Sequence, residues 1–362
     1  MKGQFHVIDT NRHVMEPSDL WDTWLEQGYK GQVTVGDDGT SIVVKGRSVS
    51  DPRPSYLDVP SYRRVFQDAL NSGFDASSHL KDMDKEGVDV GVLLPTRGMY
   101  VIWADHIDTD LSAALCRAYN NWLHSYCAAD PRRLKGVALV PLQGTEEAKA
   151  ELRRAVQELG FVAVYMRPNP LLKRKLHDPA YDSLYAEAES LGVPILLHEG
   201  WGSVLHQLGE DRQDTIFGLE GVLDPFEMML ALMSFMGHNV LERFPDLKVG
   251  YLGSGAGWIP YWLDRVDEHW GGPFGAEASS TEAPSILFKR QGFACVEPGE
   301  RTTPEVVDEV GNHCLVWGSQ YPHPELTDFP NELDSFVADP LLTDETKTRI
   351  LWDNAASLFR IS

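Results

Sequence analysis

Three observations predict an α/β fold, a distorted (β/α)8 TIM barrel. Eight short apolar or β-branched runs recur along the chain, segments with helical spacing separate them, and no glycine-rich nucleotide motif follows any run. Runs that are apolar on both faces are typical of buried parallel strands, and their alternation with helices favours a parallel sheet. No GxGxxG or GxxxxGK(S/T) sequence gives a reason to prefer an open sheet, so we predict that the sheet closes.

The predicted strands and helices alternate along the whole chain. The strands fall at 5–9, 88–94, 136–140, 161–166, 193–198, 247–252, 292–296 and 314–318. The clearest helices fall at 110–128, 145–159, 179–191, 224–243, 257–269 and 304–312. The chain shows no internal repeat and no linker that would divide it, and single barrels often exceed ~250 residues. We therefore expect one barrel domain over 1–362.

A long insertion interrupts this alternation after the first strand. Residues 25–75 are too many for a plain loop, and within them the runs 32–35 and 41–45 flank Gly36-Asp37-Asp38-Gly39. Two short runs around such a turn are typical of a β-hairpin. We expect the insertion to form a hairpin, as a lid over the mouth of the barrel.

Composition excludes several classes of partner. The net charge of −22 would repel nucleic acid and anionic membranes. No apolar run approaches ~18 residues, which argues against a membrane span. The first residues lack the features of a signal peptide, and the four cysteines show no CxxC spacing. These features predict a cytoplasmic protein with reduced thiols, acting on a small molecule.

Polar side chains gather where the predicted strands end. Catalytic residues of barrel enzymes lie at the carboxyl ends of the strands. Asn11 and His13 are two residues apart, so they would point the same way. A lone histidine is more often structural than a ligand, but His13 and His198 each end a strand. Their nitrogen donors and the neighbouring oxygen donors predict a metal site. The candidate ligands are Asn11, His13, Glu16, His198, Glu199, Asp224 and Gln320, and His198, Gln320 and His323 are candidate catalytic residues.

Several segments carry a resemblance to a known family. They lie at 8–17, 80–95, 167–170, 194–200, 224–228, 241–258 and 318–325. With them the chain resembles the amidohydrolase superfamily, in the branch of aminocarboxymuconate-semialdehyde decarboxylase. The resemblance implies a carboxylate and a histidine after strand one, a histidine after strand five and an aspartate after strand eight. These would hold one divalent metal, and the last aspartate would manage protons.

The sequence departs from that pattern at four positions. Asn11 stands in place of a carboxylate, Gln320 in place of the proton-handling aspartate, Asp224 where histidine is common, and Gly253 in place of glutamate or histidine. An amide cannot shuttle a proton at neutral pH, although its carbonyl oxygen can still bind a metal. Ordinary hydrolysis, which needs a base beside the metal-bound water, therefore fits poorly.

Two interpretations of this residue set follow. In the first, the chain is a hydrolase or a non-oxidative decarboxylase of a small carboxylic acid, with one Zn or Mn and with displaced acid–base groups. In the second, Asp224 and the neighbouring glutamates join His13 and His198 in a mixed carboxylate–imidazole set, which suits iron. That set resembles the nonheme diiron monooxygenases of terpenoid antibiotic biosynthesis, of the platensimycin type, with two Fe ions, O2 and an electron donor. The second interpretation is favoured. A binding protein without catalysis is disfavoured, because drift would not retain so many ligands.

The expected substrate pocket combines aromatic and basic residues. Trp201 and Trp258 would line an apolar cavity. Arg97, Arg167, Lys173 and Arg174 would hold a carboxylate or the phosphates of a coenzyme A thioester. The alternative interpretations are core aromatics and a solvated basic loop. The sequence leaves the substrate open and is compatible with a homodimer.

Overall fold

The computed structural model describes residues 1–36, 41–49, 60–102, 104–199, 207–323 and 328–362. Its main sheet has eight strands in the order β1-β5-β6-β7-β8-β9-β10-β11, and each neighbouring pair in that order is parallel. The predicted barrel is thereby confirmed. The strands are β1 Ile8–His13, β5 Val90–Leu94, β6 Leu134–Ala138, β7 Ala163–Met166, β8 Ile195–His198, β9 Val249–Leu252, β10 Gly292–Val296 and β11 Leu315–Trp317.

The first and last strands meet through individual hydrogen bonds. The Thr10 hydroxyl donates to the carbonyl of Trp317 over 2.8 Å, and the backbone N–H of Gln320 donates to the carbonyl of Asn11 over 2.8 Å. These bonds bring the ends of β1 and β11 together and nearly close the barrel. The polar residues that end the two strands therefore lie side by side.

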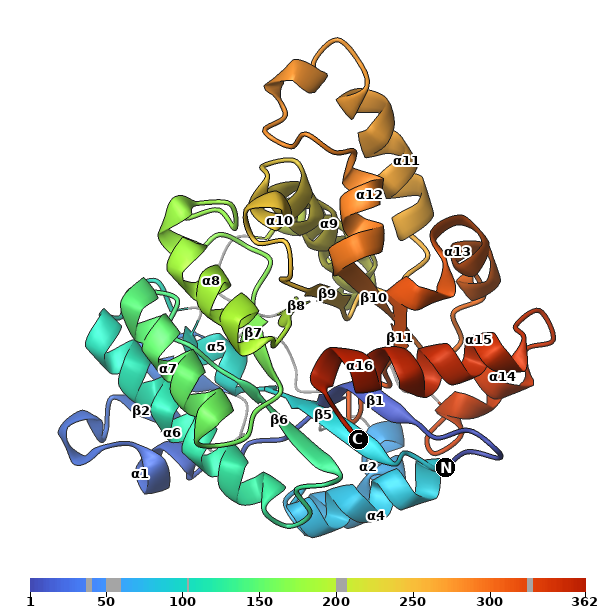
Figure 1. Cartoon of the computed structure of the whole chain (residues 1–362). Coiled ribbons are helices and arrows are strands. Elements are labelled where there is room, and N and C mark those ends of the chain that lie inside the picture. Colours follow the sequence, from blue (N-terminus) through green and yellow to red (C-terminus); the bar gives the residue numbers. More distant parts are fainter. Residues whose placement is uncertain (37–40, 50–59, 103, 200–206, 324–327) are drawn as a thin grey trace.

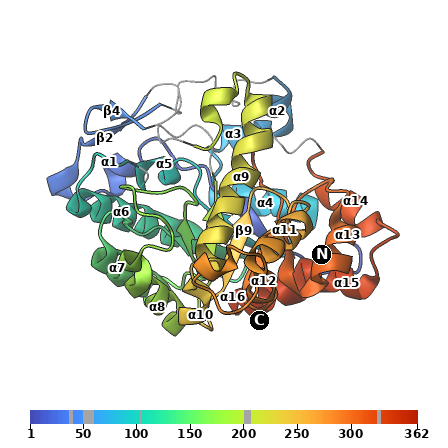
Figure 2. The ribbon, with the colours of Figure 1, turned by 90° about the horizontal axis from the view of Figure 1, so that it is seen from above.

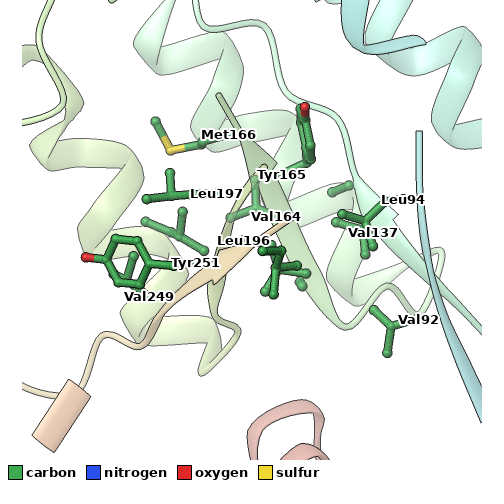
Figure 3. Close-up of a cluster of buried hydrophobic side chains, with 14 of the residues drawn as sticks. Val92, Leu94, Val137, Val164, Tyr165, Met166, Leu196, Leu197, Val249 and Tyr251 are labelled. Carbon is green, nitrogen blue, oxygen red and sulfur yellow. The ribbon is translucent and has the colours of Figure 1, made fainter. Parts of the chain in front are cut away.

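The strands pack their apolar side chains together at the centre of the molecule. Val92 of β5, Val137 of β6, Val164 of β7 and Leu196 of β8 belong to one fully buried cluster, shown in Figure 3. The β-branched residues among them suit the pleated surface of a sheet. This rigid core positions the strand ends.

Helices surround the sheet (Figure 1). Caps set their ends: the Asp75 carboxylate accepts from the N–H of Ser78 at the start of α4, and Gly87 ends that helix at φ +87°. The helices are α1 Leu20–Trp24, α2 Pro60–Val65, α3 Gln67–Asn71, α4 Ala76–Glu86, α5 Gly98–Ile102, α6 Thr109–Cys127, α7 Thr145–Gln157, α8 Asp182–Leu191, α9 Ile216–Met236, α10 Val240–Arg243, α11 Ile259–Trp270, α12 Pro284–Gln291, α13 Thr303–Val310, α14 Glu332–Ala338, α15 Asp344–Thr348 and α16 Asn354–Phe359.

Two predicted boundaries are wrong. The first strand was expected at 5–9 but runs over Ile8–His13, so Asn11 and His13 lie within the strand instead of after it. The helix expected at 224–243 begins at Ile216, where the Thr215 side chain caps it. It ends at Met236, and Asn239 adopts a left-handed φ of 52° before the separate α10. Side-chain capping and this backbone conformation override the hydrophobic pattern at both ends.

The insertion contains a small antiparallel sheet of β2 Val33–Val35, β3 Ile42–Val44 and β4 Arg47–Ser48. The hairpin is confirmed, although residues 37–40 of its turn lie outside the described residues. His106 donates from Nε2 to the carbonyl of Val44 over 2.9 Å, and Lys45 pairs with Asp108 at 2.5 Å. Figure 2 shows β2, β4, α2 and α3 on one side of the molecule. A lid function for this sheet stays a prediction.

The cysteines and the hydropathy of the helices complete the description of the fold. All four cysteines are buried free thiols. In the part of the chain that the structure describes, no helix combines the length and hydropathy needed to cross a membrane.

Candidate active site

His13 and His198 face each other from the ends of β1 and β8. Their Nε2 atoms lie 3.3 Å apart, and their ring centroids are 4.8 Å apart. The Nδ1 of His13 donates to the carbonyl of Pro95 over 2.7 Å, and the Nδ1 of His198 donates to the carbonyl of Glu199. A carbonyl oxygen only accepts hydrogen bonds, so both Nδ1 atoms carry the proton. Each Nε2 is therefore unprotonated and carries a free lone pair.

A third acceptor atom joins this pair. The Oδ1 of Asn11 lies 3.2 Å from the Nε2 of His13, and its Nδ2 has no hydrogen-bond partner among the described residues. Three electron-rich atoms therefore converge without a proton between them. Such an arrangement repels itself unless a cation sits among the three atoms. Imidazole nitrogens and an amide oxygen are suitable ligands for a divalent transition metal.

Burial keeps both histidines neutral. It lowers the pKa of His13 well below its ordinary value, and neighbouring His323 and His198 lower it further. Burial lowers the pKa of His198 to about 4. The neutral imidazole is the form that binds metals, so both residues are in the binding form at neutral pH.

Gly253 makes room for His198. Its backbone adopts φ +75°, and a Cβ added there would lie 2.6 Å from the Nε2 of His198. From the sequence, Gly253 counted as a lost ligand after strand six. The structure gives a steric reason for the glycine, because any side chain would collide with the imidazole.

His323 packs against the pair from the loop after β11. Its ring meets that of His13 edge to face, with centroids 4.4 Å apart. The Nε2 of His323 lies 3.4 Å from the hydroxyl of Thr96. Burial, followed by the influence of His198, lowers the pKa of His323 to about 3. The structure thus brings together Asn11, His13, His198 and His323.

Gln320 lies beside this group and is held by a residue that the sequence analysis missed. Its Nε2 donates to the Oε1 of Glu297 over 3.0 Å. Glu297 directly follows β10. The rule that selected the other candidates, a polar residue at a strand end, also applies to Glu297 and would have found it.

Glu16 and Arg97 connect two loops. The Glu16 carboxylate accepts backbone N–H groups of Thr96, Arg97 and Gly98, over 3.1, 2.7 and 2.9 Å. The Arg97 guanidinium donates to the carbonyl of Glu16 over 2.6 Å. Both residues therefore hold the β1 loop against the start of α5.

Glu199 and Arg167 are both buried, and each influences the pKa of the other. Burial raises the pKa of Glu199 to about 8, and the charge of Arg167 opposes this rise. Gln207 donates its Nε2 to the Glu199 carboxylate. Burial lowers the pKa of Arg167, and the charge of Glu199 makes the largest contribution in the opposite direction. The predicted roles of Glu199 as a metal ligand and of Arg167 as a substrate-binding residue stay predictions.

The predicted basic residues Lys173 and Arg174 do not act together with Arg167. Lys173 is exposed, and Arg174 donates to the carbonyls of Leu142 and Gln143 over 3.0 and 3.2 Å. Arg174 therefore fastens its loop to the loop after β6.

The remaining candidates lie elsewhere. Trp258 is buried and donates its Nε1 to the carbonyl of Gly255 over 3.0 Å, so it packs the loop after β9. Asp224 lies inside α9 and is partly buried, and Trp201 lies outside the described residues.

Within the described ranges, no group of three or more His, Cys, Asp or Glu side chains is placed to hold a metal. The two-iron centre expected from Glu16, Glu199 and Asp224 has no support in this geometry.

Comparisons with known proteins agree with the fold. A sequence model described as "Amidohydrolase" matches residues 8–361. A 2-amino-3-carboxymuconate-6-semialdehyde decarboxylase of Dictyostelium discoideum is 25% identical over 297 residues, covering 81% of this chain and 78% of the relative. A gamma-resorcylate decarboxylase of Polaromonas sp. (strain JS666) is 24% identical over 294 residues, covering 77% and 86%.

Two solved structures share the fold. A dihydroxybenzoic acid decarboxylase from Polaromonas sp. JS666, with bound manganese and the inhibitor 2-nitroresorcinol, superposes with a TM-score of 0.71 at 19% identity, over 99% of this chain and 98% of the other. A 5-carboxyvanillate decarboxylase from Novosphingobium aromaticivorans, also with bound manganese, gives a TM-score of 0.75 at 18% identity, over 99% and 98%.

These comparisons correct one expectation. The chain was expected to be an oxidoreductase, a diiron monooxygenase of antibiotic biosynthesis. That expectation is wrong, because curated relatives of the chain are decarboxylases and, in one case, a hydratase. The mixed carboxylate–imidazole set that suggested iron was inferred from residue types, and the fold does not assemble it. With its eight-stranded barrel and a match over residues 8–361, the chain belongs to the amidohydrolase family.

Proposed function

We propose that this chain is a metal-dependent, non-oxidative decarboxylase of a small carboxylic acid, with one divalent metal ion held by His13 and His198. The observation that carries the proposal is the convergence of His13 Nε2, His198 Nε2 and Asn11 Oδ1 at the barrel mouth. Manganese is our first choice of metal, because it is bound in two decarboxylases with this fold.

The chain prepares the metal site through its backbone. The carbonyls of Pro95 and Glu199 accept the Nδ1 protons of the two histidines. These bonds fix the tautomer and the direction of each ring, and they make each Nε2 a better donor to a metal. When bound, the metal ion supplies a Lewis acid for the oxygen atoms of an acidic substrate.

Decarboxylation requires one proton to be held and returned. In the net reaction, RCOOH gives RH and CO2: the C–C bond breaks, its electron pair stays on carbon, and that carbon takes the proton. Gln320 cannot carry this proton, because an amide does not titrate at neutral pH. We assign the transfer of this proton to His323, the remaining imidazole beside His13, which also meets the Thr96 hydroxyl. Because burial lowers the pKa of His323 to about 3, it takes up the proton only transiently and passes it on to the substrate carbon.

The test is CO2 release by the manganese-loaded protein. The acids to be offered are those in the names of the relatives, gamma-resorcylate and 5-carboxyvanillate, with other aromatic and unsaturated carboxylic acids. One acid in the panel is expected to release CO2 without O2 and, in D2O, to gain deuterium at the carbon that lost CO2. Chelation of the metal should stop the reaction. Product oxygen derived from O2, or addition of water without CO2 release, would contradict the proposal.

A further inference from the structure

We infer that Glu297 is a positioning residue that turns the carbonyl oxygen of the Gln320 side chain toward the metal site; the inference rests on the proposed function. Gln320 follows β11 directly and has a left-handed φ of 62°. Residues other than glycine rarely adopt this conformation, and such outliers gather at functional sites. The position of Gln320 therefore needs a cause.

Two backbone hydrogen bonds hold Gln320 in place. Its N–H donates to the carbonyl of Asn11 over 2.8 Å, and its own carbonyl accepts the N–H of His323 over 2.8 Å. The residue is thereby fixed between a proposed metal ligand and the proposed proton carrier. These bonds place the backbone but leave the side-chain amide free to choose between two orientations.

Glu297 makes that choice. A carboxylate accepts hydrogen bonds, so it selects the NH2 edge of the amide, as the 3.0 Å bond from Gln320 Nε2 to Glu297 Oε1 shows. The carbonyl oxygen of Gln320 is then left on the opposite edge. If the amide were rotated by a half-turn, it would present its NH2 group to the site, and an NH2 group does not bind a cation.

Glu297 is itself held by its loop. The Oε2 of Glu300 accepts the backbone N–H of Glu297 over 3.2 Å, and the Oε1 of Glu300 accepts that of Ala256 over 2.8 Å. Both glutamates also line a cavity of about 440 Å³ against α14. The backbone of Glu297 is therefore held by its own loop, so its carboxylate reaches Gln320 from a fixed backbone position.

The experiment is a double-mutant cycle in which calorimetric titration measures the affinity of the metal-free full-length protein and of each variant for Mn²⁺. Glu297→Ala should weaken binding by about 10- to 100-fold, which is typical for loss of an outer partner of a metal site. Glu297→Gln, which keeps an acceptor oxygen, should stay within about threefold of wild type. In a Gln320→Ala background, Glu297→Ala should have no further effect, because its action passes through Gln320. Glu305→Ala, an exposed site on α13, controls for the change in charge.

Three outcomes overturn the inference. Wild-type affinity in Glu297→Ala would remove any role, and equal losses in the single variant and in the Gln320→Ala background would show a role independent of Gln320. A Glu297→Gln variant as weak as Glu297→Ala would show that charge, not orientation, matters. Absence of Mn²⁺ binding by the wild-type protein would instead overturn the proposed function, and this inference with it. Circular dichroism of every variant identifies any that fails to fold. If Glu297→Ala fails, the Mn²⁺ affinity of Glu297→Gln relative to wild type decides.

Discussion

The Nε2 atoms of His13 and His198 lie 3.3 Å apart, and each ring donates its Nδ1–H to a backbone carbonyl, so neither Nε2 carries a proton. The hydrogen bonds to the backbone therefore orient the Nε2 lone pairs of the two rings toward each other. Neutral imidazoles in this arrangement favour a shared cation.

Gly253→Ala should displace His198. The new Cβ would lie 2.6 Å from the imidazole Nε2, so the ring must move and Mn²⁺ affinity should fall by at least about tenfold. Gly160→Ala is the matched control, because Gly160 has a similar φ of +73° and nothing within 4 Å of an added Cβ. The control should lose about 1–2 kcal/mol of stability from left-handed strain alone and should keep its metal affinity. Equal Mn²⁺ affinities in the two variants would show that the ring does not need this space.

Acid should destabilise the metal-free protein through its buried histidines. The pKa of His198 is lowered to about 4 and that of His323 to about 3. As pH falls below about 6.5, the unfolded chain takes up protons that the folded protein refuses, so the free energy of unfolding decreases. For His198 the loss should reach about 2 kcal/mol at about pH 5.

Urea unfolding between about pH 7.5 and 5 measures this effect. His323→Gln should flatten the dependence on pH, whereas His124→Gln, at an exposed position, should leave it unchanged. Stability that is constant or rises on acidification in the wild-type protein would contradict the account.

Glu16→Gln separates a structural role from a ligand role. The carboxylate accepts three backbone N–H groups, and an amide can satisfy them only in part. The free energy of unfolding should fall by about 1–3 kcal/mol, while Mn²⁺ affinity should stay close to that of wild type. Lost metal binding at unchanged stability would return Glu16 to the ligand set.

The sequence predicted the barrel because the apolar runs of its strands repeat along the chain. It singled out His13 and His198 because each lies at the end of such a run. Apolar runs mark the strands, and His13 and His198 end two of them. The true extent of β1 was not predictable in this way. Arg12 is fully buried within that strand because Asp9 and Glu86, at 3.0 and 2.7 Å, neutralise it. Such pairing between distant segments leaves no periodic signal.

The same limit applies to the site residues. Glu16 looked like a ligand by type, but backbone amides from the loop after β5 occupy its carboxylate. Gly253 looked like a loss, but its missing side chain leaves space for His198. In each case the deciding neighbour comes from another strand, so only the folded structure shows it.

The metal content of the His13→Ala/His198→Ala double variant tests the central claim most directly. Wild-type and variant proteins are loaded with Mn²⁺, freed of unbound metal by gel filtration and measured by elemental analysis. The wild-type chain is expected to retain about one Mn²⁺ and the double variant almost none, since two of its strongest ligands are gone. Full metal content in the double variant, or two metal ions in each wild-type chain, would contradict a single site held by His13 and His198.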